Sequence, residues 1–134
     1  MTPQAPSRRI MVVDDDSEIV DMTRIVLESG GYEVIPVLSG PEALQKAAAT
    51  RPDLILLDIN MPEVDGWEVL KMLKVDEETS AIPVAMFSIK LEVRDKVLGL
   101  KEGAFDYITK PFSCDELLDR VGRIFHELSE AEGG

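Results

Sequence analysis

The chain has 134 residues, of which 45% are apolar and 30% charged, a balance typical of a single folded domain. Its formal net charge of -12 argues against binding to a nucleic-acid backbone and favours cations and basic protein surfaces as partners. The single cysteine excludes an internal disulfide and fits a reducing compartment, so we expect a cytoplasmic protein. No apolar run is long enough for a membrane span, and the first residues lack a secretory signal.

Short apolar runs alternate with longer helical patterns, which is typical of a parallel sheet flanked by helices. The predicted strands are Ile10–Val13, Tyr32–Val37, Leu54–Leu57, Val84–Phe87 and Tyr107–Thr109. Helical patterns fill the gaps between them, and a last one closes the chain. Its inward face is expected to carry Cys114, Leu117, Leu118, Val121, Ile124, Phe125 and Leu128. We expect one domain over residues 9–128, with flexible tails over residues 1–8 and 129–134.

The composition of the strands predicts their order in the sheet. Three of them (IMVV, LILL and VAMF) are continuously apolar, as central strands covered on both faces are. The second strand contains Pro36, which cannot donate to a sheet ladder, and the fifth is short and mixed in polarity, so both belong at edges. With right-handed crossovers, these features predict a doubly wound, flavodoxin-like α/β fold with strand order 2-1-3-4-5 and five flanking helices.

Polar side chains follow four of the predicted strands at their carboxyl ends. They are Asp14, Asp15 and Asp16 after the first strand, Asp58 after the third, Ser88 after the fourth and Lys110 after the fifth. Ligands of open parallel sheets bind outside these ends, near the point where the strand order reverses. We therefore expect carboxylates, a hydroxyl and an ammonium group to meet in one crevice.

Several carboxylates in one cleft stay ionised most easily when they share a hard cation, and their oxygen atoms suit Mg²⁺. The thiolate and imidazole ligands typical of zinc sites are missing from these positions. Asp58 is then the natural nucleophile toward phosphorus, with Mg²⁺ and Lys110 neutralising the phosphoryl oxygens. Asp16 precedes a helical run and is expected to cap that helix rather than to bind metal.

Four motifs in this order and spacing resemble the response regulator receiver domains of two-component signalling, including single-domain chemotaxis-type regulators. They are VVDDD at 12–16, LDINMP at 57–62 followed by DG at 65–66, MFS at 86–88, and YITKPF at 107–112. The resemblance extends over residues 9–128, the expected receiver domain. It implies a phosphoacceptor signalling switch, not a turnover enzyme, that is phosphorylated by a histidine kinase or a histidine phosphotransfer protein.

The resemblance also implies a role for each matched residue of the site. Asp58 accepts the phosphoryl group. Asp15 and Asp58 hold Mg²⁺ directly, together with the backbone carbonyl of Asn60, while Asp14 acts largely through water. Lys110 pairs with the phosphoryl oxygens.

Ser88 and Tyr107 are the implied switch residues, which alter the surface formed by the fourth helix, the fifth strand and the fifth helix. Tyr107 also reads equally well as an edge-strand aromatic that covers the core. On the expected fourth helix, Leu91 and Leu98 should lie opposite the core stripe, which makes them candidates for contact with a downstream partner or a second copy of the chain.

Three residues near the expected site resemble positions that set the lifetime of the phosphoryl group: Asn60, Ile89 and Lys90. The family usually has a small residue where Ile89 stands. The larger side chain should hinder an attacking water, so a long-lived phosphorylated state is expected.

Two alternative functions stay open on the sequence. The first is a pseudo-receiver that binds partners without phosphorylation, which the intact set of Asp15, Asp58, Ser88 and Lys110 disfavours. The second is a Mg²⁺-dependent phosphohydrolase with an aspartyl nucleophile, which would carry a second acid where Asn60 stands. Expected partners are a kinase or phosphotransfer protein, an unknown downstream protein and a second copy of the chain in a phosphorylation-dependent homodimer, with no direct contact to nucleic acid or membrane.

Overall fold

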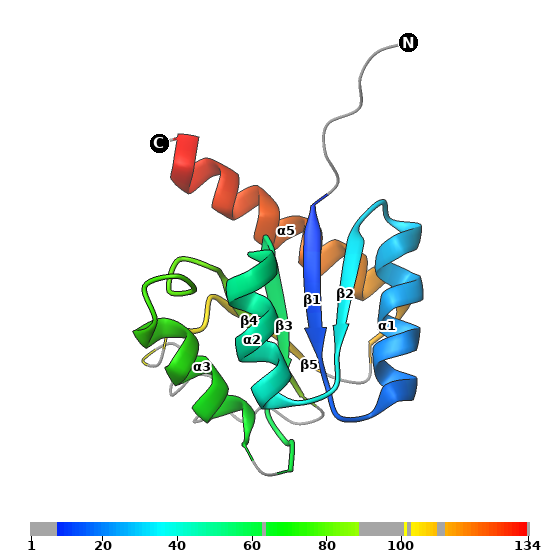
Figure 1. The fold of residues 1–134 in the computed structure, drawn as a ribbon. Helices are drawn as coiled ribbons and strands as arrows, with labels where there is room; N and C mark the ends of the chain where they lie inside the picture. The colour runs from blue at the N-terminus through cyan, green and yellow to red at the C-terminus, as the bar shows by residue number, and fades with distance from the viewer. Residues whose placement is uncertain (1–7, 63, 89–100, 102, 110–111, 134) are drawn as a thin grey trace.

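A computed structural model describes residues 8–62, 64–88, 101, 103–109 and 112–133. One five-stranded sheet crosses the molecule, and helices cover both of its faces (Figure 1). The strands are β1 (Arg9–Val13), β2 (Glu33–Val37), β3 (Leu54–Asp58), β4 (Val84–Ser88) and β5 (Asp106–Thr109). The helices, numbered as in Figure 1, are α1 (Ser17–Ser29), α2 (Gly40–Thr50), α3 (Gly66–Val75) and α5 (Cys114–Gly133).

The strand order is β2-β1-β3-β4-β5, and every neighbouring pair is parallel, so the predicted topology is confirmed. Each predicted strand boundary lies within one residue of the observed one. Pro36 is exposed on the edge strand β2, where its missing N–H costs no ladder hydrogen bond. The continuously apolar strands β1, β3 and β4 occupy the centre because both of their faces are buried.

The helices agree in part with the prediction of five. The described part of the chain contains four, and the expected helix between β4 and β5 falls on residues 89–100, outside that part. At the other end, α5 continues to Gly133, so residues 129–133 are helical where a flexible tail was expected. The stretch after Leu128 contains Glu and Ala and no proline, so helix propensity favours its continuation. The expected N-terminal tail falls almost wholly on residues 1–7, which are not described.

Alternate residues of the strands build two core layers. One layer lies between the sheet and the helices α2 and α3, and includes Met11, Leu57 and Leu70. The other lies between the sheet and the helices α1 and α5, and includes Phe87 and Leu117. In Figure 1 the helices α2 and α3 stand in front of the sheet, and α5 runs behind it.

The buried face of α5 follows the predicted spacing with one exception. Leu117, Val121, Ile124 and Phe125 are buried, whereas Cys114 is exposed, contrary to its expected place on the inward face. Leu117 is the first buried side chain of this helix, so its first residues stand outside the core. Among the described residues, no helix is both long and apolar enough to cross a membrane.

Candidate functional site

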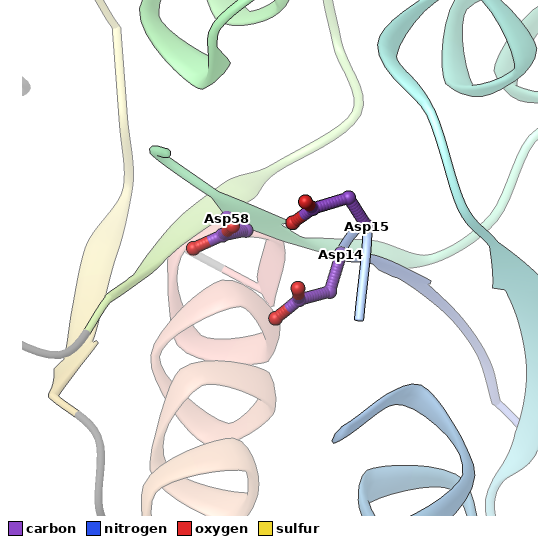
Figure 2. Close-up of side chains that lie close together, drawn as sticks. All are labelled: Asp14, Asp15 and Asp58. Atoms are coloured by element: carbon purple, nitrogen blue, oxygen red, sulfur yellow. The ribbon is translucent and has the colours of Figure 1, made fainter. Parts of the chain in front are cut away.

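Three carboxylates meet where β1 and β3 end. The two strands pair in register from Ile10 with Leu54 to Val13 with Leu57, so Asp14 and Asp58 occupy equivalent positions on neighbouring strands. One carboxylate oxygen each from Asp14, Asp15 and Asp58 lies within 4.8 Å of the other two (Figure 2). The structure therefore brings together the three carboxylates expected at this edge of the sheet.

The three carboxylates differ in their access to solvent. Asp14 and Asp58 are 2% and 5% exposed, whereas Asp15 is exposed. Like charges this close repel one another, and burial weakens the screening of that repulsion by water. A cation that reached the cluster from the solvent side, past Asp15, would offset the repulsion.

Local hydrogen bonds orient the turn that follows β1. The backbone N–H of Asp14 donates to the Val37 carbonyl at 3.1 Å, which ties the end of β1 to the end of β2. The Asp14 carboxylate accepts from the backbone N–H of Asp16 at 3.0 Å. The Asp16 carboxylate in turn accepts from the backbone N–H of Glu18 at 3.0 Å, so Asp16 caps α1, as expected. The run of three aspartates thus contributes two members to the cluster and one to a helix start.

The loop between β3 and α3 folds back over the main chain of Asp58. The backbone N–H of Gly66 donates to the Ile59 carbonyl at 2.8 Å. A Cβ atom at Gly66 would lie only 2.2 Å from the carbonyl oxygen of Asp58. In the sequence, Gly66 is part of the DG motif at 65–66 and no role was predicted for it; the available signal was a glycine at the first position of a helix, directly after a capping aspartate.

Asn60 and Ser88 are placed at the same edge of the sheet. Asn60 follows the end of β3 and is exposed. Ser88 is the last residue of β4, one position beyond Phe87, which pairs with Asp58, and its own partner in register is Thr109 of β5. The predicted residues Ile89, Lys90, Leu91, Leu98 and Lys110 lie outside the described residues.

Tyr107 is buried in this structure, with 9% of its surface exposed, and belongs to the core layer beneath α2 and α3. Its backbone N–H donates to the Asp106 carboxylate at 2.7 Å, and Arg120 of α5 holds the same carboxylate at 3.0 Å. The arrangement agrees with a core aromatic at the sheet edge. Its expected part in a switch stays a prediction.

The donor set of the cluster fits a hard divalent cation. All three groups offer carboxylate oxygens, the ligand type that Mg²⁺ prefers, and neither thiolate nor imidazole takes part in the cluster. Mg²⁺ usually keeps several waters and binds through one or two carboxylates. A partly exposed cluster with one exposed carboxylate suits that mode.

Comparison with known proteins identifies the class. The model of the response regulator receiver domain family matches residues 10–122, and the chain belongs to that family. The resemblance inferred from the four motifs is therefore confirmed. Receiver domains are signalling components of two-component systems and are generally not classed as enzymes.

The chain is similar to curated regulators about twice its length and to solved structures of about its own length. Among curated proteins, the alkaline phosphatase synthesis transcriptional regulatory protein PhoP of Bacillus subtilis is 47% identical over 118 residues, which cover 88% of this chain and 48% of PhoP. The DNA-binding dual master transcriptional regulator RpaA of Synechocystis is 43% identical over 113 residues, which cover 84% of this chain and 47% of RpaA. The chain thus spans about half the length of these curated relatives.

Among solved structures, the chemotaxis protein CheY4 of Vibrio cholerae superimposes with a TM-score of 0.84 at 32% identity, over 89% of this chain and 99% of CheY4. A CheY-like receiver domain protein from Methanospirillum hungatei gives a TM-score of 0.83 at 30% identity, over 93% of this chain and 99% of the other. These matches extend over nearly the whole of a receiver domain.

Proposed function

We propose that the chain is a phosphoacceptor switch in which Asp58 receives a phosphoryl group from a histidine kinase or a histidine phosphotransfer protein. The observation that carries the proposal is the place of Asp58. It is nearly buried at the end of the central strand β3, with one oxygen within 4.8 Å of oxygens from Asp14 and Asp15. Membership of the receiver family supports the same reaction.

In the proposed transfer, an oxygen of Asp58 bonds to phosphorus while the bond from phosphorus to the donor imidazole nitrogen breaks. The electron pair of that bond returns to the imidazole, which takes up a proton from solvent. Mg²⁺, when bound, neutralises charge on the phosphoryl oxygens. Asp15, Asp58 and the backbone carbonyl of Asn60 would hold the cation directly, and Asp14 would act largely through water.

The remaining roles are proposed from the family. Lys110 pairs with the phosphoryl oxygens, and Ser88 and Tyr107 respond to phosphorylation by altering the surface of the fourth helix, β5 and α5. Phosphorylation and its loss are self-catalysed, without turnover of a metabolite.

Asn60, Ile89 and Lys90 are proposed to set the lifetime of the phosphoryl group. Because the Ile89 side chain should hinder an attacking water, Ile89→Ala should speed the loss of the phosphoryl group. An unchanged rate of dephosphorylation in that variant would count against the assignment.

The proposed partners are proteins. The names of PhoP and RpaA describe a transcriptional regulator and a DNA-binding regulator, and this chain matches about half of each. We propose that the matching half communicates through its own surface with a downstream protein or with a second copy of the chain, and that this acidic domain does not contact DNA itself. The cytoplasmic location stays a prediction.

The test is incubation of the chain with acetyl phosphate and Mg²⁺, followed by intact mass measurement. The wild type should gain one phosphoryl group, and Asp58→Asn should gain none. Asp21→Asn is the matched control, because Asp21 is an exposed carboxylate of α1 paired with Arg24; it should react like the wild type. A wild type that gains no phosphoryl group, or an Asp58→Asn variant that gains it equally well, contradicts the proposal.

The mass measurement tests the first alternative, the pseudo-receiver, and an assay of phosphate release tests the second, the phosphohydrolase. A pseudo-receiver would show no mass gain in any variant. A phosphohydrolase would release inorganic phosphate continuously from p-nitrophenyl phosphate, with many turnovers per chain, whereas the proposed switch should release none beyond background.

A further inference from the structure

Gly66 lies against the main chain of the proposed phosphoacceptor. A Cβ atom built on it would lie 2.2 Å from the Asp58 carbonyl oxygen, 2.9 Å from the Asp58 carbonyl carbon and 2.7 Å from the Ile59 Cα atom. All three atoms belong to the backbone, which cannot move aside as the end of a flexible side chain can. Any side chain at position 66 must therefore displace either the loop or the end of β3.

The requirement for glycine here is one of space and not of backbone conformation. Among the described residues, the positive φ angles belong to Gly31, Arg51 and Gly103, so Gly66 is not among them. Gly66 is the first residue of α3. Asp65 caps this helix, because its carboxylate accepts a hydrogen bond from the backbone N–H of Glu68 with an N···O distance of 3.0 Å. Helix propensity favours alanine over glycine, whereas the close contact with Asp58 and Ile59 opposes a larger residue.

The contact reaches the geometry of the carboxylate cluster through the backbone of Asp58. The cluster depends on three oxygens that lie within 4.8 Å of one another, and one of them is carried by Asp58. The hydrogen bond from the Gly66 N–H to the Ile59 carbonyl, 2.8 Å long, holds the loop down on this segment. A shift of β3 at residue 58 would move the carboxylate relative to Asp14 and Asp15, which directly follow β1.

We propose that Gly66 is a positioning residue for the cation site: its close contact with the Asp58 and Ile59 backbone sets the place of the Asp58 carboxylate for Mg²⁺. The inference rests on the proposed function of Asp58. Gly66 itself would touch neither the cation nor the phosphoryl group. It would act through the main chain of Asp58, which touches both.

The test measures Mg²⁺ affinity in folded protein by titration calorimetry for the wild type and three variants. Gly66→Ala should bind Mg²⁺ about tenfold more weakly, since misplacement of a site group by about 1 Å is costly. Gly122→Ala is the matched control, because a Cβ there meets nothing within 4 Å. Leu73→Ala controls for stability, because Leu73 is a fully buried residue of the same helix. Both controls should bind within twofold of the wild type at a temperature where circular dichroism shows every variant folded.

A second measurement needs no substitution and decides the question if Gly66→Ala does not fold. If the Gly66 contact favours the cation, the cation must favour the contact to the same degree. Mg²⁺ should therefore slow hydrogen exchange of the Gly66 amide more than that of the Phe105 amide, which donates to the Val84 carbonyl at 2.7 Å at the opposite end of β4.

The outcomes are distinct. A folded Gly66→Ala variant with wild-type Mg²⁺ affinity, or equal slowing of the two amides, overturns the role of Gly66 and leaves the proposed function standing. A wild type that binds no Mg²⁺ and gains no phosphoryl group overturns the proposed function and this inference with it.

Discussion

At the carboxyl ends of β1 and β3 three carboxylates lie close together, whereas at the amino ends of the same strands the charged groups of Arg8, Arg9 and Asp53 contact backbone groups and an aromatic ring. Arg9 donates its backbone N–H to the Asp53 carboxylate at 2.8 Å, and its guanidinium donates to the carbonyls of Thr50 and Arg51, which end α2. Arg8 lies 4.5 Å above the ring of Phe125. The carboxyl end has the arrangement of a binding site. At the amino end, the contacts hold β1 to the end of α2 and to α5.

The two ends of the sheet should contribute differently to the free energy of unfolding. The hydrogen bonds of Arg9 and Asp53 at the amino end stabilise the fold without a bound ligand. Like charges as close as those of Asp14, Asp15 and Asp58 repel one another, and a bound cation would offset that repulsion. Substitutions at the carboxyl end of the sheet should thus change the stabilisation by Mg²⁺, and substitutions at the amino end should not.

The largest expected effect is the stabilisation of the wild type by Mg²⁺. At a concentration about 100 times the dissociation constant, binding to the folded state alone should raise the free energy of unfolding by about 2.7 kcal/mol. Urea titrations with and without Mg²⁺, at ionic strength matched with NaCl, measure the increase. Asp58→Asn should lose most of it, and an equal increase in that variant would place the cation elsewhere.

Arg9→Met should have the next largest effect, at the opposite end. It removes the guanidinium hydrogen bonds to the two carbonyls that end α2 but keeps the backbone hydrogen bond to Asp53. The free energy of unfolding should fall by about 1.5 kcal/mol. Urea denaturation should give the same loss with and without Mg²⁺, while the control Arg123→Met, which breaks an exposed pair with Asp119, should cost less than about 0.5 kcal/mol. A loss that depends on Mg²⁺ would contradict the separation of the two ends.

Asp15→Asn should produce a smaller change of opposite sign. In metal-free buffer it removes one of three mutually repelling charges, and because Asp15 is exposed the gain should be only about 0.5 kcal/mol. The gain should shrink at high salt, where charges are screened. Thermal denaturation at low and high ionic strength provides the measurement, and a gain that does not depend on salt would argue for another cause.

The smallest expected effect concerns pH at the amino end. Burial raises the pKa of Tyr32 above its ordinary value of 10.0, and the nearby Arg8 opposes part of this shift. The folded state therefore favours the neutral phenol, so its stabilising contribution is complete below pH 10 and is lost as the pH rises through the folded-state pKa. Because Tyr32 is partly exposed, the loss should stay below about 0.5 kcal/mol.

Tyr32→Phe retains a ring to stack on Phe125, whose centroid lies 5.6 Å away, and lacks the ionising hydroxyl. Denaturation between pH 9 and pH 11 should therefore show a shallower decline in stability for the variant than for the wild type. Parallel curves for the two proteins would remove Tyr32 as the cause.

The sequence alone determined the strand order of the sheet and the meeting of three aspartates at one edge of it. Continuous apolar runs predict buried central strands, and Pro36 marks an edge, so the strand order follows from local composition. Once the order is known, the aspartates after β1 and β3 must converge, because neighbouring parallel strands end at the same edge.

The tertiary structure decided what depends on distances between remote segments. The approach of Gly66 to the Asp58 carbonyl, the contact of Arg9 with the end of α2 and the exposure of Cys114 have no counterpart in hydrophobic periodicity. Periodicity reports which side of an element faces the core, whereas these contacts depend on how closely two backbones pack and where a helix begins to overlap the sheet.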